Sequence, residues 1–458
     1  MSALTTILCA VAVLTNETAD LQEQIDRVSA VGGGVVRVAR GDHLVASIRL
    51  KSGVTLQLDE GARLLASTNA ADYTVLSDDN RGAVVWSDSA RDIALVGKGT
   101  VDGRGGDVPR VCGTPNRWRG VTFYRSKGVR IEGVSICNAH TWGCYLRECE
   151  DVRIRSVRIE NHVNYNNDGL DIEASDVLVE DCEIDSEDDA LVFKTRSPRS
   201  RVENVVVRHC RFFSNSSAIK IGTESWGRFG NICVTDCVVG VSRPISVRDD
   251  YSGVPGVTNR MTGLAAIDLS VVDGGSLDGF RATDIRIGAG FLVPFFLRYG
   301  RRNVSECESI YRNVRIERVR MTGCAASRLS SAVTGVAAFN WTDLSSWGDL
   351  LAPWNWNRLK PFRPSDVLFR DIEMRLPADD EDDDIRWIVP ERAEMYPVAF
   401  MFGPDLLPSA AFYVRHADGV RFEDVRIRRV VGCRRRPFLV AEDADVRGFP
   451  VEVKGDGE

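Results

Sequence analysis

The chain has 458 residues, of which 44% are hydrophobic and 27% charged, and its net charge is −7. This composition is sufficient for a buried core and excludes a disordered or collagen-like chain. Neither a basic domain nor a basic tail is present, which argues against nucleic acid as a partner.

The first fifteen residues, MSALTTILCAVAVLT, are largely apolar and are compatible with a degenerate signal peptide or a first β-strand. They lack a positively charged n-region and a clean A-x-A cleavage site, which favours the strand, and a cytoplasmic protein over a periplasmic or secreted one. No apolar run in the chain reaches the roughly 18 residues of a membrane helix, so we expect no membrane partner.

A capping helix is predicted next. Asn16 can serve as the N-cap of a helix over about 17–29, with Leu21, Ile25 and Val28 on one face. Gly32–Gly34 would end this helix, and Val35–Val38 would begin the first regular strand. A helix over the open end of a sheet covers its unpaired edge.

An eight-residue pattern then recurs along the chain, with apolar residues at its first, third, sixth and eighth positions. It begins at Val129, Val152, Val177, Val205, Ile232, Phe280, Val314, Val367 and Val420. The first five starts are separated by 23 to 28 residues. Period-2 spacing on each side of a two-residue break indicates two short strands joined by a bend, and excludes a helix.

A unit of this kind cannot bury its apolar face alone, so successive units must stack. Stacked strand–bend–strand units form a parallel β-helix, with coils about 4.8 Å apart. We therefore predict an all-β fold, a parallel β-helix with an N-terminal capping helix.

We expect one domain over 1–458. It would comprise a cap over 1–31, main coils over 32–334, a loop insertion over 335–400, and the last coils and tail over 401–458. The insertion is rich in Trp (Trp341, Trp347, Trp354 and Trp356) and contains the acidic run Asp379–Asp384, which is typical of a solvated loop.

The twelve cysteines raise the question of metal or disulfide sites. No C-x-x-C pair occurs, and no His ligands follow Cys233 and Cys237, so zinc spacing is absent. Cys182, Cys210 and Cys237 stand where equivalent repeats carry Val or Ile. We expect free thiols that act as small buried hydrophobes, with no metal and no cofactor.

A second strand follows each repeat, and aligning these strands on a small residue gives two polar columns. The first column holds Trp142, Asp168, Asp189 and Ser217, with Asp188 beside Asp189. The second holds Glu173, Lys194, Gly222, Arg248 and Arg298, and Lys220 lies between the two columns.

These columns suggest a chemistry. Stacked like charges raise one another's pKa, so at least one of the carboxyl groups can hold a proton near neutral pH. Glycoside hydrolysis needs such a pair, an acid for the leaving oxygen and a base for water. The flanking cations suit an anionic sugar, because they can pair with its carboxylate.

Structural explanations stand beside these assignments. Asn167-Asp168-Gly169 is common turn chemistry, and Glu187-Asp188-Asp189 could be a solvated corner. Arg248 and Arg298 could simply neutralise Glu173 and neighbouring acids. His140, one coil before Asp168, could reach a groove or serve the fold alone.

These residues resemble glycoside hydrolase family 28, the polygalacturonases and rhamnogalacturonan hydrolases, in its bacterial form. Asn166-Asn167-Asp168-Gly169 is similar to the family's N-T-D-G, and Asp188-Asp189 to its paired aspartates. GGGVVRV near 32–38, LKSGVTLQLDEGARLLAS at 50–67 and GKGTVDGRG at 97–105 resemble its N-terminal coils. MYPVAFMFG and AFYVRHADGVRFEDV resemble its C-terminal segments.

The resemblance implies a right-handed β-helix that hydrolyses α-linked galacturonate with inversion and without a metal. Asp188 would be the general acid, and Asp168 and Asp189 would activate the water. Two positions depart from the family. Its G-H-G is replaced by Ser216-Ser217-Ala218, and its R-I-K aligns with Ser246-Val247-Arg248, which keeps one cation.

The sequence therefore predicts a glycosidase that acts on pectic polysaccharide or oligosaccharide. The residues expected to bind substrate are Asn166, Lys194, Ser217, Lys220, Arg248, Arg298, His140 and Trp142. The Trp-rich insertion could close one end of a groove, which favours exo action. The rival predictions are a carbohydrate-binding β-helix without catalysis and a polysaccharide lyase on the same fold.

Overall fold

A computed structural model describes residues 10–14, 20–75, 81–110, 117–242, 263–303, 309–325, 331–337, 361–376, 389, 407, 410–429 and 439–452. The chain divides into two compact units, residues 1–184 and 185–458. Strand pairings are described below within each unit, and the prediction of a single domain stays a prediction.

The first unit contains one described α-helix, two 3₁₀ helices and a series of strands. They are β1 (Ala10–Leu14), α1 (Leu21–Ala30), β2 (Gly34–Val38), β3 (Gly41–Val45), β4 (Ile48–Arg49), β5 (Val54–Leu58), β6 (Ala62–Ala66), η1 (Ala70–Asp72), β7 (Ala83–Asp88), β8 (Arg91–Gly97), β9 (Thr100–Asp102), η2 (Gly105–Asp107), β10 (Arg119–Tyr124), β11 (Lys127–Glu132), β12 (Ser135–Cys137), β13 (Cys144–Arg155), β14 (Arg158–Asn161) and β15 (Leu170–Glu180). Strand β16 (Glu183–Ser186) includes the division between the units.

The second unit contains strands throughout its described part. They are β17 (Leu191–Thr195), β18 (Arg201–Arg208), β19 (Arg211–Ser214), β20 (Ser217–Ser225), β21 (Arg228–Val241), β22 (Gly263–Val271), β23 (Ser276–Ile287), β24 (Phe291–Tyr299), β25 (Tyr311–Met321), β26 (Ser331–Thr334), β27 (Ser365–Leu376), β28 (Phe412–Arg429), β29 (Leu439–Arg447) and β30 (Val451–Glu452).

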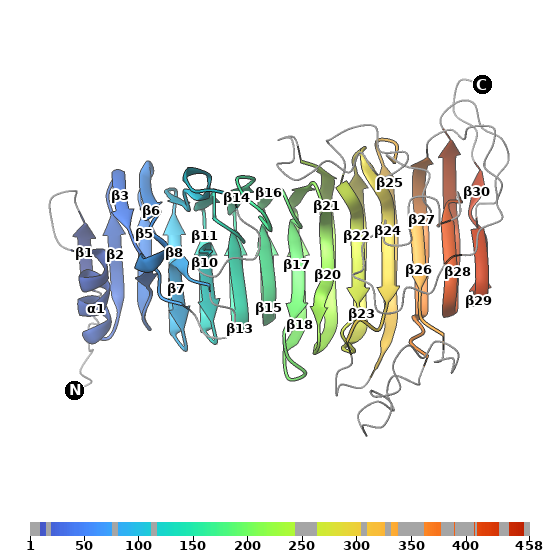
Figure 1. Cartoon of the computed structure of the whole chain (residues 1–458), viewed down its shortest axis with the longest axis horizontal. Coiled ribbons are helices and arrows are strands. Elements are labelled where there is room, and N and C mark those ends of the chain that lie inside the picture. Colours follow the sequence, from blue (N-terminus) through green and yellow to red (C-terminus); the bar gives the residue numbers. More distant parts are fainter. Residues whose placement is uncertain are drawn as a thin grey trace, which may run out of the picture. The chain divides into compact units, whose positions relative to one another are not determined.

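Each unit is a stretch of right-handed parallel β-helix, as predicted, with its strands side by side in successive coils (Figure 1). The repeats stack in register: Val129 pairs with Val152 and Val152 with Val177 in the first unit. In the second unit, one column of paired repeat starts runs through Val205, Ile232, Phe280, Val314, Val367 and Val420. The apolar positions of the repeat are buried and form the core.

Left-handed residues create the bends of the repeat. The residue before each repeat has positive φ, as at Asp176 (57°) and Asn204 (58°), and so does its fifth residue, as at Asp181 (56°) and Asp236 (52°). Asn and Asp adopt this conformation more readily than other non-glycine residues, because their short polar side chains bond locally. The two-residue break seen in the sequence is therefore a left-handed corner between two strands.

Cysteine takes the place of Val or Ile inside this core. Cys182, Cys210 and Cys237 are buried thiols that form no disulfide, as expected. The sulfur of Cys210 donates to the carbonyl of Arg208 at 3.1 Å. Burial raises the pKa of the Cys144 and Cys149 thiols, the latter to about 12. These thiols are packing groups of the coils.

The capping helix is confirmed, but its predicted start is wrong. Helix α1 begins at Leu21, and its N-cap is Asp20, whose carboxylate accepts from the Gln22 N–H at 3.0 Å. The predicted N-cap, Asn16, lies outside the described residues. Leu21, Ile25 and Val28 are buried, as the helical spacing predicted.

Among the described residues, no helix is long and apolar enough to cross a membrane, and α1 has only ten residues.

The chain leaves α1 through a turn that requires glycine. Gly33 has φ of 110°, and a Cβ built there would lie 2.5 Å from the carbonyl oxygen of Gly53. The close approach lets Gly34 N–H donate to the same carbonyl at 3.0 Å. Strand β2 then pairs with β5 on one side and with β1 on the other. Residues 10–14 are thus a strand, one of the two interpretations given for the apolar N-terminus.

The range 335–400 is not all loop. Strand β27 lies within it and continues the repeat column between β25 and β28. The four tryptophans of the predicted insertion and Asp379–Asp384 lie outside the described residues.

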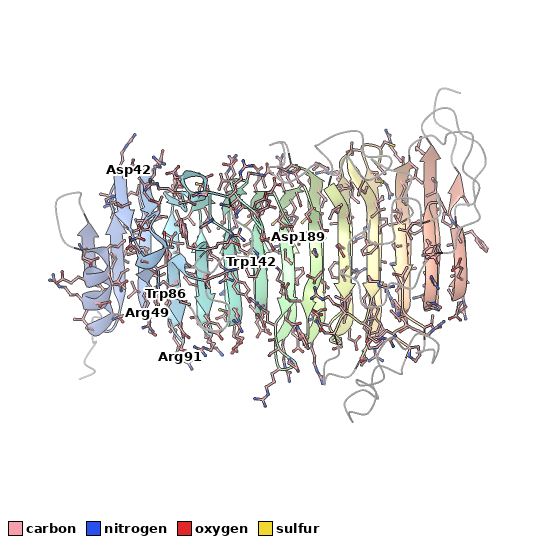
Figure 2. The ribbon with its side chains drawn as sticks, in the orientation of Figure 1. Asp42, Arg49, Trp86, Arg91, Trp142 and Asp189 are labelled. Carbon is pink, nitrogen blue, oxygen red and sulfur yellow. The ribbon has the colours of Figure 1, made fainter. Side chains whose placement is uncertain are left out.

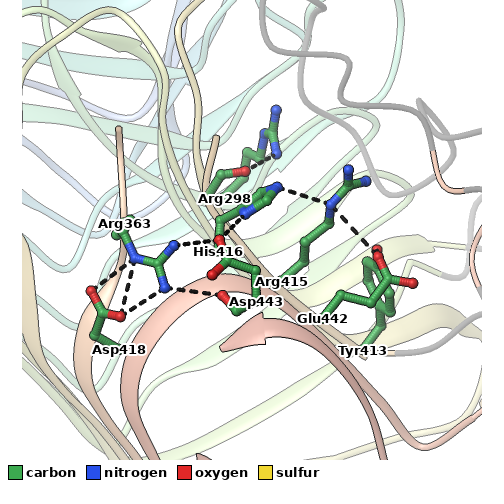
Figure 3. A network of polar contacts seen from close by, with 9 residues as sticks. Arg298, Arg363, Tyr413, Arg415, His416, Asp418, Glu442 and Asp443 are labelled. Carbon is green, nitrogen blue, oxygen red and sulfur yellow. Dashed lines mark hydrogen bonds and ion pairs between the residues drawn. The ribbon is translucent and has the colours of Figure 1, made fainter. Parts of the chain in front are cut away.

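An ion-pair network joins the last described coils of the second unit (Figure 3). Arg363 donates to both oxygens of Asp418, and its Nη1 lies 2.7 Å from Asp443 Oδ2. His416 Nδ1 also contacts Asp443 Oδ2 at 2.7 Å, and its Nε2 accepts from Arg415 Nε at 3.0 Å. Because Nε2 accepts, the imidazole proton lies on Nδ1 and is donated to Asp443.

Replacing Arg363 tests this network. We expect Arg363→Gln to lower the free energy of unfolding by about 1 kcal/mol, the upper end for exposed ion pairs, because one guanidinium serves two carboxylates. The hydrogen bond from His416, followed by that from Arg363, lowers the pKa of Asp443. Its contribution is therefore present above the ordinary carboxyl pKa and lost as pH falls through the lowered pKa.

The measurement is the melting temperature of both proteins at pH 6 and pH 3, where the difference should shrink. Arg318→Gln is the matched control, because Arg318 pairs with one carboxylate, Asp284, at 2.7 Å and both side chains are exposed. Equal losses for the two variants, with no pH dependence, would contradict a cooperative network.

Candidate active site

The predicted first column is in register within each unit. In the first unit, Cys144 pairs with Leu170, and Gly143 N–H donates to the Asp168 carbonyl at 2.8 Å, which places Trp142 beside Asp168. In the second unit, Ala190 N–H donates to the Ser217 carbonyl at 3.0 Å, beside the pair Leu191 and Ile219. Asp189 therefore lies next to Ser217, as the alignment predicted.

The paired aspartates form a buried corner at the start of β17, and the alternative of a solvated corner is wrong. Asp188 is 7% exposed, Asp189 is 5% exposed and Glu187 is fully buried. The Asp188 carbonyl accepts from the hydroxyls of Ser186 at 2.9 Å and Ser214 at 2.6 Å. The Asp188 carboxylate accepts from Asp189 N–H at 3.1 Å, so the two residues are held together.

The Asp189 carboxylate is held by two donors from the next coil. Oδ1 accepts from the backbone N–H of Ser217 at 3.0 Å. Oδ2 accepts from Lys220 Nζ at 2.8 Å, in an ion pair in which both side chains are less than a tenth exposed. Asp189, labelled in Figure 2, lies just before β17. Lys220, predicted to bind substrate, therefore holds a carboxylate of the site.

A carboxylate that the sequence analysis missed lies on the next coil. Strand β22 pairs with β20, with Lys220 opposite Asp268. The Ser217 hydroxyl donates to Asp268 Oδ2 at 3.0 Å, and the Ser270 hydroxyl donates to Oδ1. The alternation of AAIDLSV at 265–271 was a signal for this strand.

The second column also needs a correction at this coil. Lys194 lies at an irregularity, because Phe193 pairs with Ile221 but Thr195 pairs with Ser225. On the next coil the member of this column is Ser270 and not Arg248, because β22 pairs with β20. Ser270 in turn pairs with Arg298. Arg248 itself lies outside the described residues.

The cations of this column contact groups of the chain itself. Lys194 Nζ lies 3.9 Å from Glu224 Oε2. Burial alone would raise the pKa of Glu224, but Lys194, with further attraction from Arg196 and Arg302, lowers it to about 2. Arg298 is buried and donates to the Gly335 carbonyl at 2.9 Å (Figure 3). A role for Lys194 and Arg298 in binding substrate stays a prediction.

In the first unit, Asp168 follows a tightly bonded asparagine turn. Asn167 Nδ2 donates to the carbonyls of Ala139 at 3.0 Å and Thr141 at 2.8 Å. Asn161 Nδ2 donates to the Thr141 carbonyl at 2.6 Å and the Asp168 carbonyl at 3.0 Å. The turn chemistry anticipated at Asn167 is therefore real, and it fixes the backbone on which Asp168, 3% exposed, is carried.

Arg117 links this turn to His140. Its guanidinium donates to Asn166 Oδ1 at 3.1 Å, to the Tyr165 carbonyl and to the His140 carbonyl at 3.0 Å. Asn166 has φ of 51°, a left-handed conformation that asparagine tolerates. The side chain of Asn166, predicted to bind substrate, thus accepts from an arginine of the same unit.

His140 packs against an aromatic wall. Its ring meets Trp118 edge-on at 4.5 Å, and Trp118 stacks on Tyr73 at 4.7 Å. Burial, assisted by the charge of Arg117, lowers the pKa of His140 to about 4, so the imidazole is neutral at neutral pH. Among the described residues, neither ring nitrogen has a hydrogen-bond partner.

Trp142, labelled in Figure 2, has two guanidinium groups near its ring. Arg119 is 4.5 Å and Arg81 is 5.2 Å from its ring centre, and Tyr145 meets it edge-on at 5.0 Å. The Tyr145 hydroxyl donates to Glu173 Oε2 at 2.8 Å. Glu173, the acid of the second column, is therefore satisfied within the first unit.

Metal ligation has no candidate in the part of the chain that the structure describes, where no group of three or more His, Cys, Asp or Glu side chains is placed to hold an ion.

Solved structures share this fold. An exopolygalacturonase from Thermotoga maritima matches with a TM-score of 0.52 and 17% identity, over 93% of this chain and 87% of that one. A polygalacturonase from Erwinia carotovora matches with a TM-score of 0.54 and 14% identity, over 96% of each chain. In fold, the chain is a parallel β-helix of the kind these proteins have.

Sequence comparison points to a family. Residues 32–248 match the model of Glycosyl hydrolases family 28. An endo-polygalacturonase of Pectobacterium carotovorum is 24% identical over 257 residues, 50% of this chain and 63% of that protein. A polygalacturonase of Ralstonia solanacearum is 27% identical over 164 residues, 32% of this chain and 29% of that protein. Residues 32–248 therefore resemble glycoside hydrolase family 28, and the chain spans less than two thirds of the length of these two relatives.

Removing the Asn167 side chain tests the turn before Asp168. Asn167→Ala removes the side-chain donor of the Ala139 carbonyl, one of the two side-chain donors of the Thr141 carbonyl, and the acceptor of the Asn164 N–H. We expect a loss of about 2–3 kcal/mol in the free energy of unfolding, because each unsatisfied buried group costs about 1–3 kcal/mol. Chemical denaturation measures the loss.

Ser175→Ala, at a half-buried position of β15, is the control and should change stability by less than about 0.5 kcal/mol. A loss at Asn167 no larger than at Ser175 would show that the turn is not fixed by this side chain.

Proposed function

We propose that the protein is a glycosidase that hydrolyses an α-linked galacturonate, or a related uronic acid, in pectic polysaccharide or oligosaccharide. The proposal is carried by one observation, the buried corner Asp188–Asp189 with its Lys220 ion pair, found in a chain that resembles this family. The relatives named as polygalacturonases support the substrate class.

The roles follow the family resemblance. Asp188 is the general acid that protonates the leaving oxygen, and Asp168 and Asp189 activate the water. The contacts of Asp189 support its part, because an ammonium and a backbone N–H hold its carboxylate in one orientation. Preorganised groups of this kind lower the barrier without reorganising during the reaction.

Retention of buried carboxylates supports an enzyme over a binding protein. Taking an ionised carboxylate out of water costs free energy unless it is paired, and a β-helix that only binds sugar has no need to bear that cost.

We further propose that the enzyme is exo-acting and removes sugars from a chain end. Early release of monomer from a pectic oligosaccharide, in place of a ladder of intermediate lengths, is the outcome that supports it.

The three aspartates are tested by single substitutions. Asp168→Asn, Asp188→Asn and Asp189→Asn should each lower kcat on polygalacturonate at least about a hundredfold, the scale of acid–base groups. Hydrolysis by all three at nearly the parental rate would exclude the assignment.

Stability must be followed in parallel, because Asp189→Asn breaks the buried ion pair with Lys220. Breaking a buried pair costs about 3–5 kcal/mol, so this variant should also melt at a lower temperature. The double variant Asp189→Asn with Lys220→Met removes both charges of the ion pair. If turnover is still lost when the melting temperature recovers, the loss is chemical and not a consequence of unfolding.

Product stereochemistry tests the mechanism. Inverting glycosidases hold their acid and base roughly 6.5–9.5 Å apart to admit a water, and they release product with the opposite anomeric configuration. Proton NMR of the first product, recorded before mutarotation, should show inversion. Retention would mean that one aspartate acts as a nucleophile and that the roles given above are wrong.

A further inference from the structure

A buried carboxylate outside the matched family region is linked to Asp189 through residues that the two acids share. Asp268 is 2% exposed and belongs to β22, whereas the family match ends at residue 248. Asp268 is adjacent to the two residues that hold the Asp189 carboxylate, Ser217 and Lys220. Ser217 gives its backbone N–H to Asp189 at 3.0 Å and its hydroxyl to Asp268 at 3.0 Å.

Lys220 is the second residue that links Asp189 to Asp268. Its Nζ donates to Asp189 Oδ2 at 2.8 Å, and it stands opposite Asp268 in the β20–β22 register. The attraction of the ammonium is felt by both acids, and the two acids repel each other. One buried cation therefore serves two buried carboxylates, and the ionisation of one affects the other.

The surroundings of Asp268 are otherwise apolar or neutral. On β22 the Ser270 hydroxyl donates to Oδ1, and on β24 its register partner is Phe296. On β25 the Tyr311 phenol donates to the Leu269 carbonyl at 3.0 Å. Burial raises the pKa of Tyr311, and the nearby charge of Asp268 raises it further. Burial raises the pKa of Asp268 to about 6, against the lowering effects of Lys220, Ser270 and Ser217.

We propose that Asp268 is a positioning residue of the Asp188–Asp189 site, which fixes the Asp189 carboxylate through Ser217 and Lys220. This inference rests on the proposed function. Ionised Asp268 orients the Ser217 hydroxyl and anchors the segment whose N–H and ammonium hold Asp189. Neutral Asp268 leaves the Lys220 charge to Asp189 alone. The alignment of Asp189 thus depends on the charge of Asp268.

Substitution separates this role from a structural one. Asp268→Asn keeps the size of the side chain and removes its charge. We expect kcat on polygalacturonate to fall about tenfold and KM to change by less than about twofold. In the parent protein kcat should fall as pH drops below about 6, where Asp268 takes up a proton. This acid limb of the pH profile should disappear in Asp268→Asn. Ser270→Ala removes a hydrogen bond that stabilises ionised Asp268, so it should move the same limb to higher pH.

Asp273→Asn is the matched control for loss of a buried carboxylate. Asp273 is fully buried in the same unit and pairs with Arg302 at 2.6 Å. Its replacement should lower the melting temperature and leave the limb near pH 6 in place. A limb that vanishes equally in Asp268→Asn and Asp273→Asn would show that general destabilisation is the cause, and would overturn the inference.

A double-mutant cycle tests the route through Ser217. If Asp268 acts on Asp189 through this residue, the loss in Asp268→Asn with Ser217→Ala should be smaller than the product of the single losses. Losses that simply multiply would show that the coupling between Asp268 and Asp189 does not pass through Ser217.

A readout without turnover keeps this inference distinct from the proposed function. In protein labelled with ¹³C at aspartate carboxyls, the resonance lost in Asp268→Asn should titrate near pH 6. The resonance lost in Asp189→Asn should show an inflection at the same pH, which Asp268→Asn abolishes. An enzyme inactive on every pectic substrate would refute the function and leave this coupling measurable. An Asp189 resonance that ignores the Asp268 titration would overturn the inference, whatever the activity.

Discussion

The register of hydrogen bonds between parallel coils determines which side chains of the described strands lie one above another. Each repeat places its apolar residues inward at the same positions, so Val129, Val152 and Val177 lie one above another. A slip by one residue would turn the whole apolar set of a coil outward. The left-handed corners before and within each repeat keep the register by fixing where each strand begins and bends. The carboxylates of the candidate site are carried on strands aligned in this way.

The sequence predicted the repeating part of the structure well, because its signals are local. Alternation of apolar residues and a two-residue break are both visible within eight residues, and they indicate two strands and a corner without knowledge of the partner coil. The apolar face of α1 was equally readable from Leu21, Ile25 and Val28. Its start was not, since both Asn16 and Asp20 are good N-caps and packing on the first coils decides between them.

The order of coils after β20 could not be read locally. Pro244–Arg248 and Ala265–Val271 both alternate in the manner of a strand, and the sequence does not say which one stacks on β20. The structure selects the second, which puts Ser270 where Arg248 was expected and brings Asp268 to Lys220. The partners of the site are also far apart in sequence, 31 residues for Lys220 and Asp189 and 51 for Ser217 and Asp268. Contacts of this length, and the burial they produce, have no signature in a single coil.

The excursion between β21 and β22 has a consequence for how such a protein can diversify. Ser242 N–H still donates to the Ser214 carbonyl, and Gly263 N–H to the Gly290 carbonyl, so the stack is bonded on both sides of residues 243–262. Strands β20 and β22 pair across this interval, and the entropic cost of closing a flexible connection grows only slowly with its length. Insertions, deletions or exchanged segments are therefore nearly neutral for the scaffold at this junction. A designer could therefore graft a recognition segment at this junction without displacing the carboxylates of the described coils.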